Sequence, residues 1–204
     1  MSDHGWRDSC RAFEDAAAWF VSTTRLVGDR WDRPGLGEWD VRALVGHTSR
    51  SFLTVEAYLT VPTDGIEIES PADYVRAVRP IASGPEVADR GRAAGEALGG
   101  DPVAAVVEIA DRVLGLVDTC DGSEPVMTAA GGMRLANYLP TRTFELAVHT
   151  ADLAVALDVP ADMPPTAASQ ALQLVADIAI GDGAAARLLL SATGRSVPGG
   201  FTVF

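Results

Sequence analysis

The amino-acid sequence predicts an all-α protein built as a bundle of amphipathic helices. Several long segments repeat apolar residues every three or four positions, which is the period of a helix that buries one face. Short connections rich in glycine, proline and aspartate separate these segments, and the sequence has no internal repeat. Four or five helices joined in this way are typical of a helical bundle. With 204 residues, 48% of them hydrophobic, the chain is long enough to enclose one sizeable core.

In the N-terminal part, the apolar period predicts a first helix over residues 6–28. A loop with glycine and proline follows and ends at Asp40, whose side chain is suited to cap a second helix that runs to about Leu59. A second loop leads to a short helix over residues 71–79. Pro80 ends this helix, because proline lacks the backbone N–H that the next turn needs.

In the middle of the chain, a helical region is expected over residues 86–118, with an interruption at which Asp101 caps a new start. Residues 121–133 are expected to form a loop that contains a brief extended piece. A long helix then covers about residues 135–158, and it is either kinked or begun anew at Pro140.

The C-terminal segment predicts one more helix over about residues 165–191. The remaining tail alternates turn residues with β-formers and is expected to make a short strand or hairpin. We therefore expect residues 1–160 to form the helical bundle. Residues 161–204 are expected to add a C-terminal helix and a strand-like tail that pack on the same domain.

Composition and charge exclude several classes of function. The formal net charge of −12 argues against nucleic acid and anionic membranes as partners, because both are negatively charged themselves. No apolar run reaches the about 18 residues of a membrane span and no signal peptide is evident, so we expect a cytoplasmic protein. Cys10 and Cys120 have no CxxC spacing and are expected to be free thiols. All 16 basic residues are arginines, which excludes chemistry that depends on lysine.

The helix predicted over residues 135–158 carries a polar stripe between two apolar flanks. At the helical period, Arg142, His149 and Asp152 all fall within about 60° of Glu145, so we expect the stripe to point inward. The remaining face holds small or polar residues and is expected to meet solvent: Thr143, Ala147, Thr150, Ala154 and Asp158. An unpaired buried charge costs on the order of several kcal/mol. The stripe must therefore be satisfied either by ordinary ion pairs or by a metal.

A third metal ligand is expected on the second helix. Of the three histidines, His4 is close to the first residue, whereas His47 lies on the same side of its helix as Leu44 and faces inward. Two inward histidines and one glutamate from two helices make the ligand type of catalytic zinc, which leaves a position for water or substrate. We therefore predict a divalent metal at His47, Glu145 and His149, with zinc favoured and nickel or manganese as alternatives. Taken singly, each histidine could instead be an ordinary core residue.

Two stretches of the sequence resemble the mycothiol-dependent maleylpyruvate isomerase family. They read WDRPGLGEWDVRALVGH and NYLPTRTFELAVHTADLAVAL, and the closing LLLSATGR is similar to the terminal segment of that family. The resemblance covers about residues 6–195. It implies a DinB-like four-helix bundle, a divalent metal usually taken as zinc, and mycothiol as the co-substrate. It also implies that His47, Glu145 and His149 are the metal ligands.

The ligand set favours a metal-activated thiol that attacks an electrophilic carbon, because a thiol that coordinates zinc loses its proton. The outcome is S-transfer or cis–trans isomerisation of a small electrophilic substrate. Arg142 is the expected catalytic residue, and it either orients Glu145 or meets an anionic group. Asp152 is expected either to accept the second N–H of His149 or to remain a solvated charge. The binding pocket for the thiol is assigned to four residues: Trp39, Ser51, Tyr58 and Asp152.

Two further functions stay open on the sequence alone. The same ligands could serve a metal-dependent hydrolase, although no glutamate of an HExxH motif is available as a general base. The protein could also be a non-catalytic module that binds a metal or ligand. The expected partners are a small-molecule thiol and a small electrophile, with a homodimer as one expected assembly. Family isomerases commonly carry an extra C-terminal domain, and Arg142 is the only basic residue that the sequence places beside the metal, so we expect slow or absent turnover of maleylpyruvate.

Overall fold

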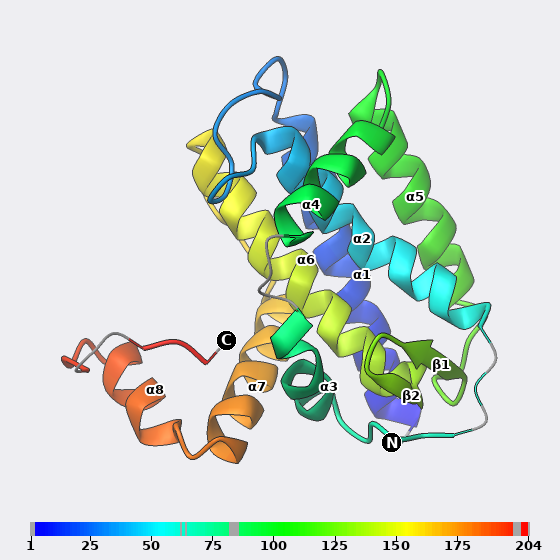
Figure 1. The fold of residues 1–204 in the computed structure, drawn as a ribbon, viewed down its shortest axis with the longest axis vertical. Coiled ribbons are helices and arrows are strands. Elements are labelled where there is room, and N and C mark those ends of the chain that lie inside the picture. Colours follow the sequence, from blue (N-terminus) through cyan, green and yellow to red (C-terminus); the bar gives the residue numbers. More distant parts are fainter. Residues whose placement is uncertain (1–2, 62, 64, 82–85, 198–200, 204) are drawn as a thin grey trace.

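Four long helices form the centre of the molecule. The structure, a computed structural model, describes residues 3–61, 63, 65–81, 86–197 and 201–203. The long helices lie side by side as a bundle (Figure 1): α1 (Asp3–Arg25), α2 (Val41–Leu59), α5 (Pro102–Val117) and α6 (Leu135–Leu157). The prediction of an all-α helical bundle is confirmed. None of the helices in these described ranges is long and apolar enough to cross a membrane.

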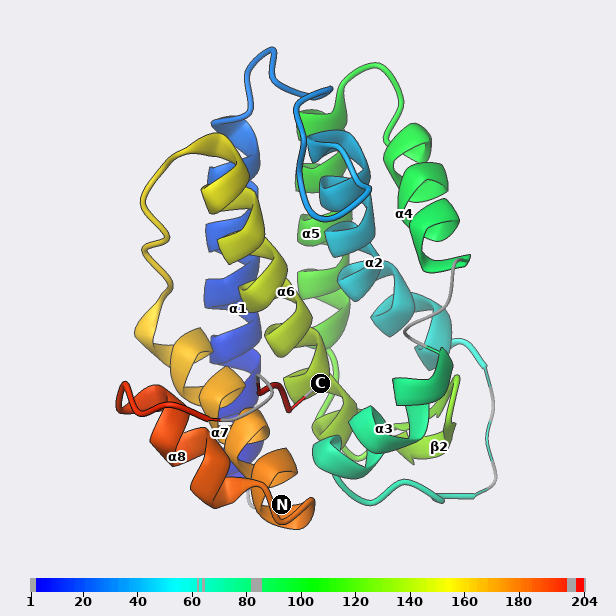
Figure 2. The ribbon, with the colours of Figure 1, turned by 60° about the vertical axis from the view of Figure 1, so that its left-hand side comes forward.

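Shorter elements surround this bundle (Figure 2). They are α3 (Pro71–Val78), the 3-10 turn η1 (Arg79–Ile81), α4 (Glu86–Ala97), β1 (Pro125–Thr128), β2 (Gly131–Arg134), α7 (Pro165–Gly181) and α8 (Ala185–Ala192). Helix α4 packs along α2, and α7 packs against α1 and α6. The two strands form an antiparallel hairpin in which Val126 stands opposite Met133, and both of these side chains are buried. The loop expected at residues 121–133 therefore contains a hairpin.

Side-chain caps determine where two of the predicted helices begin. The Oδ1 atom of Asp40 accepts a hydrogen bond from the backbone N–H of Ala43 at 2.7 Å. The Oδ1 atom of Asp101 accepts one from the backbone N–H of Ala104 at 3.0 Å and separates α4 from α5. Both caps agree with the predicted helix starts. The first of them fixes the phase of α2, because His47 follows Asp40 by about two turns.

Helix α6 runs through Pro140 without a break, so the predicted segment is one helix and not two. Proline has no backbone N–H, so at this sixth position of the helix one hydrogen bond to the preceding turn is missing and the helix continues past it. At the other end, Asp158 adopts the left-handed conformation with a φ of 58° and ends the helix. Glu145 and His149 thus lie in the regular central part of α6.

One expectation about α6 was wrong, namely that its small residues meet solvent. Of the five residues assigned to that face, four are fully buried and only Asp158 is exposed: Thr143, Ala147, Thr150 and Ala154 are the buried ones. By contrast, Val155, from a flank expected to be buried, is 76% exposed. The reason is that α6 packs against α1, α2 and α7 together, so a helix with three neighbours has no wide solvent face. Small side chains suit this position because they let neighbouring helices come close.

The C-terminal segment also differs from the prediction. The single helix expected over residues 165–191 is divided into α7 and α8 at a turn in which Gly183 has a φ of 68°, a conformation that favours glycine. In the described part of the tail, residues 193–197 and 201–203, the expected strand or hairpin is not formed. The first helix likewise ends at Arg25 and not at residue 28.

Glycines allow α4 to approach α2 closely. A Cβ atom on Gly46 would collide with the backbone of Gly95, and a Cβ atom on Gly91 would collide with the indole ring of Trp39. The Nε1 atom of Trp39 donates a hydrogen bond to the carbonyl oxygen of Ala88 at 3.0 Å. Helix α4 therefore holds Trp39 in place at the start of α2, directly beside the polar residues of the site.

Candidate metal centre

Three side chains from two helices converge in the bundle. His47 comes from α2, and Glu145 and His149 come from α6, about a hundred residues later in the chain. One potential ligand atom of each residue lies within 4.8 Å of the other two. The three sequence-predicted metal ligands are thus brought together into one site, here called the triad. His149 is 17% exposed and Glu145 is 33% exposed, so a small molecule can reach them from solvent.

The ring of His149 lies between two carboxylates of its own helix. Its Nε2 atom is 3.3 Å from Oε2 of Glu145, and its Nδ1 atom is 3.0 Å from Oδ2 of Asp152. Burial alone would lower the pKa of His149, but the hydrogen bonds to Asp152 and Glu145 outweigh it and raise the pKa to about 9. Of the two roles expected for Asp152, the contact with His149 is the one that this geometry supports. A carboxylate behind a ligating histidine commonly fixes which ring nitrogen carries the proton.

Glu145 stays ionised although it is partly buried. Burial would raise the pKa of its carboxyl group, but the hydrogen bond with His149 and the positive charge of Arg142 outweigh burial and lower the pKa to about 2. The carboxylate is therefore in the form that a cation requires as a ligand.

His47 is held in its neutral form. Burial lowers its pKa to about 4, and the nearby charges of His149, Arg50 and Arg142 act in the same direction. Its Nδ1 atom is buried and has no hydrogen-bond partner among the described residues. A buried polar atom without a partner is costly, and neutral imidazole is the form that binds metals. This unpartnered nitrogen, together with the donor set of two imidazoles and one carboxylate, fits a divalent cation.

Trp39 supports His47 from the side. The two rings stack with their centroids 4.3 Å apart and an angle of 33° between their planes. The indole is fixed by its hydrogen bond to Ala88 on α4. The sequence assigned Trp39 to thiol binding, and the structure places it against the edge of the triad, where it limits how the imidazole of His47 can turn.

Arg142 lies in a cluster of tyrosines next to the triad. Its guanidinium carbon is 4.8 Å from the ring centroid of Tyr138 and 5.6 Å from that of Tyr74, and its Nε atom donates a hydrogen bond to Oγ1 of Thr141 at 3.0 Å. Tyr58 belongs to the same cluster, with its ring centroid 5.4 Å from that of Tyr138. Arg142 and Tyr58, predicted separately, are therefore brought together, and Arg142 makes no close ion pair with Glu145.

Sequence reasoning missed three residues around the site. Tyr138 precedes Arg142 by four positions on α6, a spacing that places the two side chains together and could have revealed it. Tyr74 comes from α3, and no local pattern predicts that this short helix packs against α6. Arg50 follows His47 by three positions on α2 and was overlooked. The predicted pocket residue Ser51 is buried one turn after His47.

Comparison with known proteins agrees with this architecture. Residues 6–154 match the family described as mycothiol maleylpyruvate isomerase N-terminal domain. The matched region extends from α1 into α6 and contains the whole triad. No curated protein and no solved structure matches the chain significantly. Because the match covers well over half of the 204 residues, the chain belongs to the family of the mycothiol maleylpyruvate isomerase N-terminal domain.

Proposed function

We propose that this protein is a metal-dependent enzyme that uses a low-molecular-weight thiol, mycothiol in view of its family, to attack a small electrophilic substrate. The reaction is either transfer of the thiol to the substrate or cis–trans isomerisation of the substrate through reversible addition of the thiol. The observation that carries the proposal is the convergence of His47, Glu145 and His149, whose ligand atoms lie within 4.8 Å of one another.

The three triad residues would hold one divalent ion, with zinc favoured by the nitrogen and oxygen donors and nickel or manganese as alternatives. When bound, such an ion acts as a Lewis acid that lowers the pKa of a coordinating thiol, so that the thiolate forms near neutral pH. With three protein ligands, such a site would leave room for the thiol at the ion.

The chain's own residues would orient this chemistry. Asp152 would accept the Nδ1–H of His149 and thereby leave Nε2, which lies 3.3 Å from Oε2 of Glu145, as the ring nitrogen that can bind the ion. Trp39 restrains the ring of His47 through their stacking contact. Arg142, fixed against Tyr138, supplies a positive charge beside the reacting groups. The half-buried setting strengthens these electrostatic effects relative to bulk water.

Thiol chemistry is better supported than hydrolysis. A hydrolase would need a free general base next to a metal-activated water. The second carboxylate beside the triad is Asp152, and it is already hydrogen-bonded to Nδ1 of His149 at 3.0 Å, on the side of the ring away from Glu145. It is therefore committed to positioning the ring.

The thiol chemistry also suggests which molecules the protein meets and where it works. We propose a small thiol and a small electrophile as ligands, and a cytoplasmic protein with a homodimer as one assembly. The net charge of −12 supports the absence of nucleic acid and anionic membranes among its partners.

A thiol-transfer assay tests the proposal. Zinc-loaded and chelator-treated protein are each mixed with mycothiol and 1-chloro-2,4-dinitrobenzene, in which the thiolate sulfur displaces chloride and the thiol proton goes to solvent. We expect the loaded protein to accelerate conjugation and the metal-free protein to give the background rate. Equal rates with and without metal would contradict the proposal. Metal binding that raises the thermal midpoint without any acceleration would instead support a non-catalytic module.

A further inference from the structure

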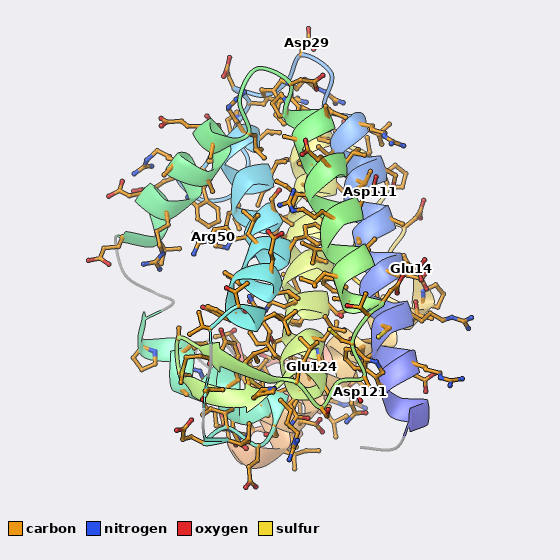
Figure 3. All side chains as sticks on the ribbon, turned by 90° about the vertical axis from the view of Figure 1, so that its right-hand side faces the viewer. Glu14, Asp29, Arg50, Asp111, Asp121 and Glu124 are labelled. Carbon is orange, nitrogen blue, oxygen red and sulfur yellow. The ribbon has the colours of Figure 1, made fainter. Side chains whose placement is uncertain are left out.

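Two arginines flank the triad, one on each of its helices. Arg50 stands three positions after His47 on α2, and Arg142 stands three positions before Glu145 on α6. Residues three apart on a helix are surface neighbours, so each arginine shares its helix face with a triad residue. The positive charges of both act on His47. Figure 3 shows Arg50 beside the middle of α2, on the side where α4 packs. The expectation that Arg142 is the only basic residue beside the metal was therefore wrong.

Neither of these arginines makes a close ion pair with a carboxylate among the described residues. Among the residues that the structure describes, no carboxylate oxygen lies within 4.0 Å of the side-chain nitrogens of Arg50 or Arg142. Other arginines of the chain do have such partners: Arg76 pairs with Asp182 at 2.7 Å, and Arg112 pairs with Glu56 at the same distance. Several exposed arginines of the chain also lack such a partner, but Arg50 and Arg142 are only partly exposed and their charges act on the partly buried ring of His47.

Arg142 is held in an orientation that suits an anion. Its guanidinium carbon lies over the rings of Tyr138 and Tyr74, and only its Nε atom has an acceptor among the described residues, Oγ1 of Thr141. The terminal N–H groups have no protein acceptor in the described structure. A guanidinium that is held over aromatic rings and keeps its terminal N–H groups free can bind a carboxylate in a bidentate manner.

The charges around the triad lead to the same ligand class. A divalent ion at the triad would be balanced by Glu145 and Asp152, because the two histidines bind as neutral rings. The two guanidinium charges would then remain uncompensated in a partly buried site, which is costly until an anion arrives. A thiolate together with one further negative group would restore the balance.

We propose that Arg50 and Arg142 form an anion subsite beside the triad, which receives a carboxylate group of the molecules that react there. The inference rests on the proposed thiol chemistry for its place in a reaction, although anion binding can be measured without turnover. The carboxylate belongs either to the electrophile or to a thiol with a free carboxyl group, which mycothiol lacks because its cysteine carboxyl is in an amide bond. Both sources offer the same planar, two-oxygen group to Arg142.

Calorimetry on the zinc-loaded full chain tests this subsite with two matched pairs of probes. For the thiol, N-acetylcysteine is compared with N-acetylcysteine amide, which lacks the carboxylate. For the electrophile, maleate is compared with dimethyl maleate. We expect at least about tenfold tighter binding of the acid in one of the pairs, since a charge-assisted bidentate contact is worth roughly 1.5–3 kcal/mol. The pair that responds identifies the source of the carboxylate.

Variants assign the effect to the two arginines. Arg142→Gln and Arg50→Gln should each weaken binding of the preferred acid about tenfold or more, without changing zinc stoichiometry or binding of the uncharged analogue. Arg142→Lys, which keeps the charge but loses the planar fork, should recover part of the affinity. Arg11→Gln is the matched control, because it removes the same charge from an exposed position of α1.

The outcomes separate this inference from the proposed function. Equal affinities for acid and uncharged analogue in both pairs, or arginine variants that bind the acid like the wild type, would overturn the anion subsite. If the subsite binds maleate but N-acetylcysteine amide never binds the zinc-loaded protein, the subsite stands and the thiol mechanism is wrong. If the amide binds and no acid is preferred, the thiol mechanism stands and the subsite is wrong.

Discussion

The α6 residues of the triad, Glu145 and His149, and the cysteine pocket show opposite responses to burial. The pocket, of about 470 Å³, is lined by Cys10 on α1 and by Cys120 after α5. Burial and then the negative charge of Asp118 raise the pKa of Cys10 to about 11, and burial and the charge of Glu124 raise that of Cys120. At the triad, burial is outweighed by partners of opposite charge, and Glu145 and His149 keep their charged forms.

This difference shows where thiol chemistry belongs in the molecule. The thiolate is the nucleophilic form, and both cysteines are held as thiols at neutral pH. Figure 3 shows Glu14 on α1 and, below it, Asp121 and Glu124 after α5, and the negative charge of these residues disfavours a thiolate in the pocket. The two cysteines are therefore poor nucleophiles, and the proposed thiol chemistry calls for an external thiol at the triad.

The largest effect is expected from loss of a metal ligand. Glu145→Gln and His47→Ala should reduce metal content from about one ion per chain to a small fraction, and thiol transfer should fall at least about 100-fold, since even an outer-shell partner of a metal commonly contributes 10- to 100-fold. Elemental analysis and the transfer assay measure these changes. The control is His4→Ala, a histidine outside the triad. Full metal content in both ligand variants would refute the assignment of the site.

The second largest effect is expected on stability, which removal of the metal should lower. At free zinc 1,000-fold above its dissociation constant, binding contributes about 4 kcal/mol, which corresponds to a thermal midpoint about 10 °C higher in a domain of this size. Scanning calorimetry with and without chelator measures the difference, and added zinc should restore it. An unchanged midpoint after verified metal removal would mean that the triad contributes little to the fold.

Metal binding should release a proton from His149. Its pKa of about 9 in the metal-free protein means that the ring is charged at pH 7, whereas a ligand must be neutral. His47, with a pKa of about 4, has no proton to lose. Calorimetry in two buffers of different ionisation enthalpy should therefore give about one proton released per ion at pH 7, falling toward zero above pH 9.

The variant that tests this proton release is Asp152→Asn, which removes the charged partner of Nδ1 of His149. It should reduce the number of protons released at pH 7 and weaken metal binding about 10- to 100-fold.

The raised pKa of His149 also makes the stability of the metal-free protein depend on pH. Without metal, the stabilisation from His149 is complete below its unfolded pKa of 6.5 and is lost as pH rises through about 9. A metal-free midpoint that rises over this range would contradict the ion-pair geometry.

Substituting both cysteines should have the smallest effect. Because both thiols are protonated and partly buried, the double variant Cys10→Ser, Cys120→Ser should keep thiol transfer within about twofold of wild type. A loss of transfer activity of more than about tenfold, with metal content intact, would mean that the reactive sulfur is a cysteine of the pocket and would contradict this account.

The sequence predicted the features that depend on one helix at a time. The spacing of Glu145, His149 and Asp152 and the cap at Asp40 are local patterns, and the helical period fixes how their side chains are arranged. The family was also recognisable from its two signature stretches, and the profile match confirms it.

What could not be predicted depends on how helices pack together. The buried face of α6 was misjudged because burial there is set by α1, α2 and α7, not by the polarity of Thr143 or Thr150. The aromatic support of Arg142 required knowing that α3 brings Tyr74 to α6. The break between α7 and α8 had a local signal in the Gly-Asp-Gly turn before residue 184, but the apolar period on both sides concealed it.

X-ray absorption at the zinc edge is the most direct test of the central claim that an external thiol is activated at the triad. The sample is the zinc-loaded double variant Cys10→Ser, Cys120→Ser, which has no cysteine sulfur of its own, measured before and after addition of N-acetylcysteine amide. The account predicts only nitrogen and oxygen neighbours at first, and one sulfur neighbour at about 2.3 Å after the thiol is added. A spectrum that shows no sulfur neighbour with saturating thiol would contradict it.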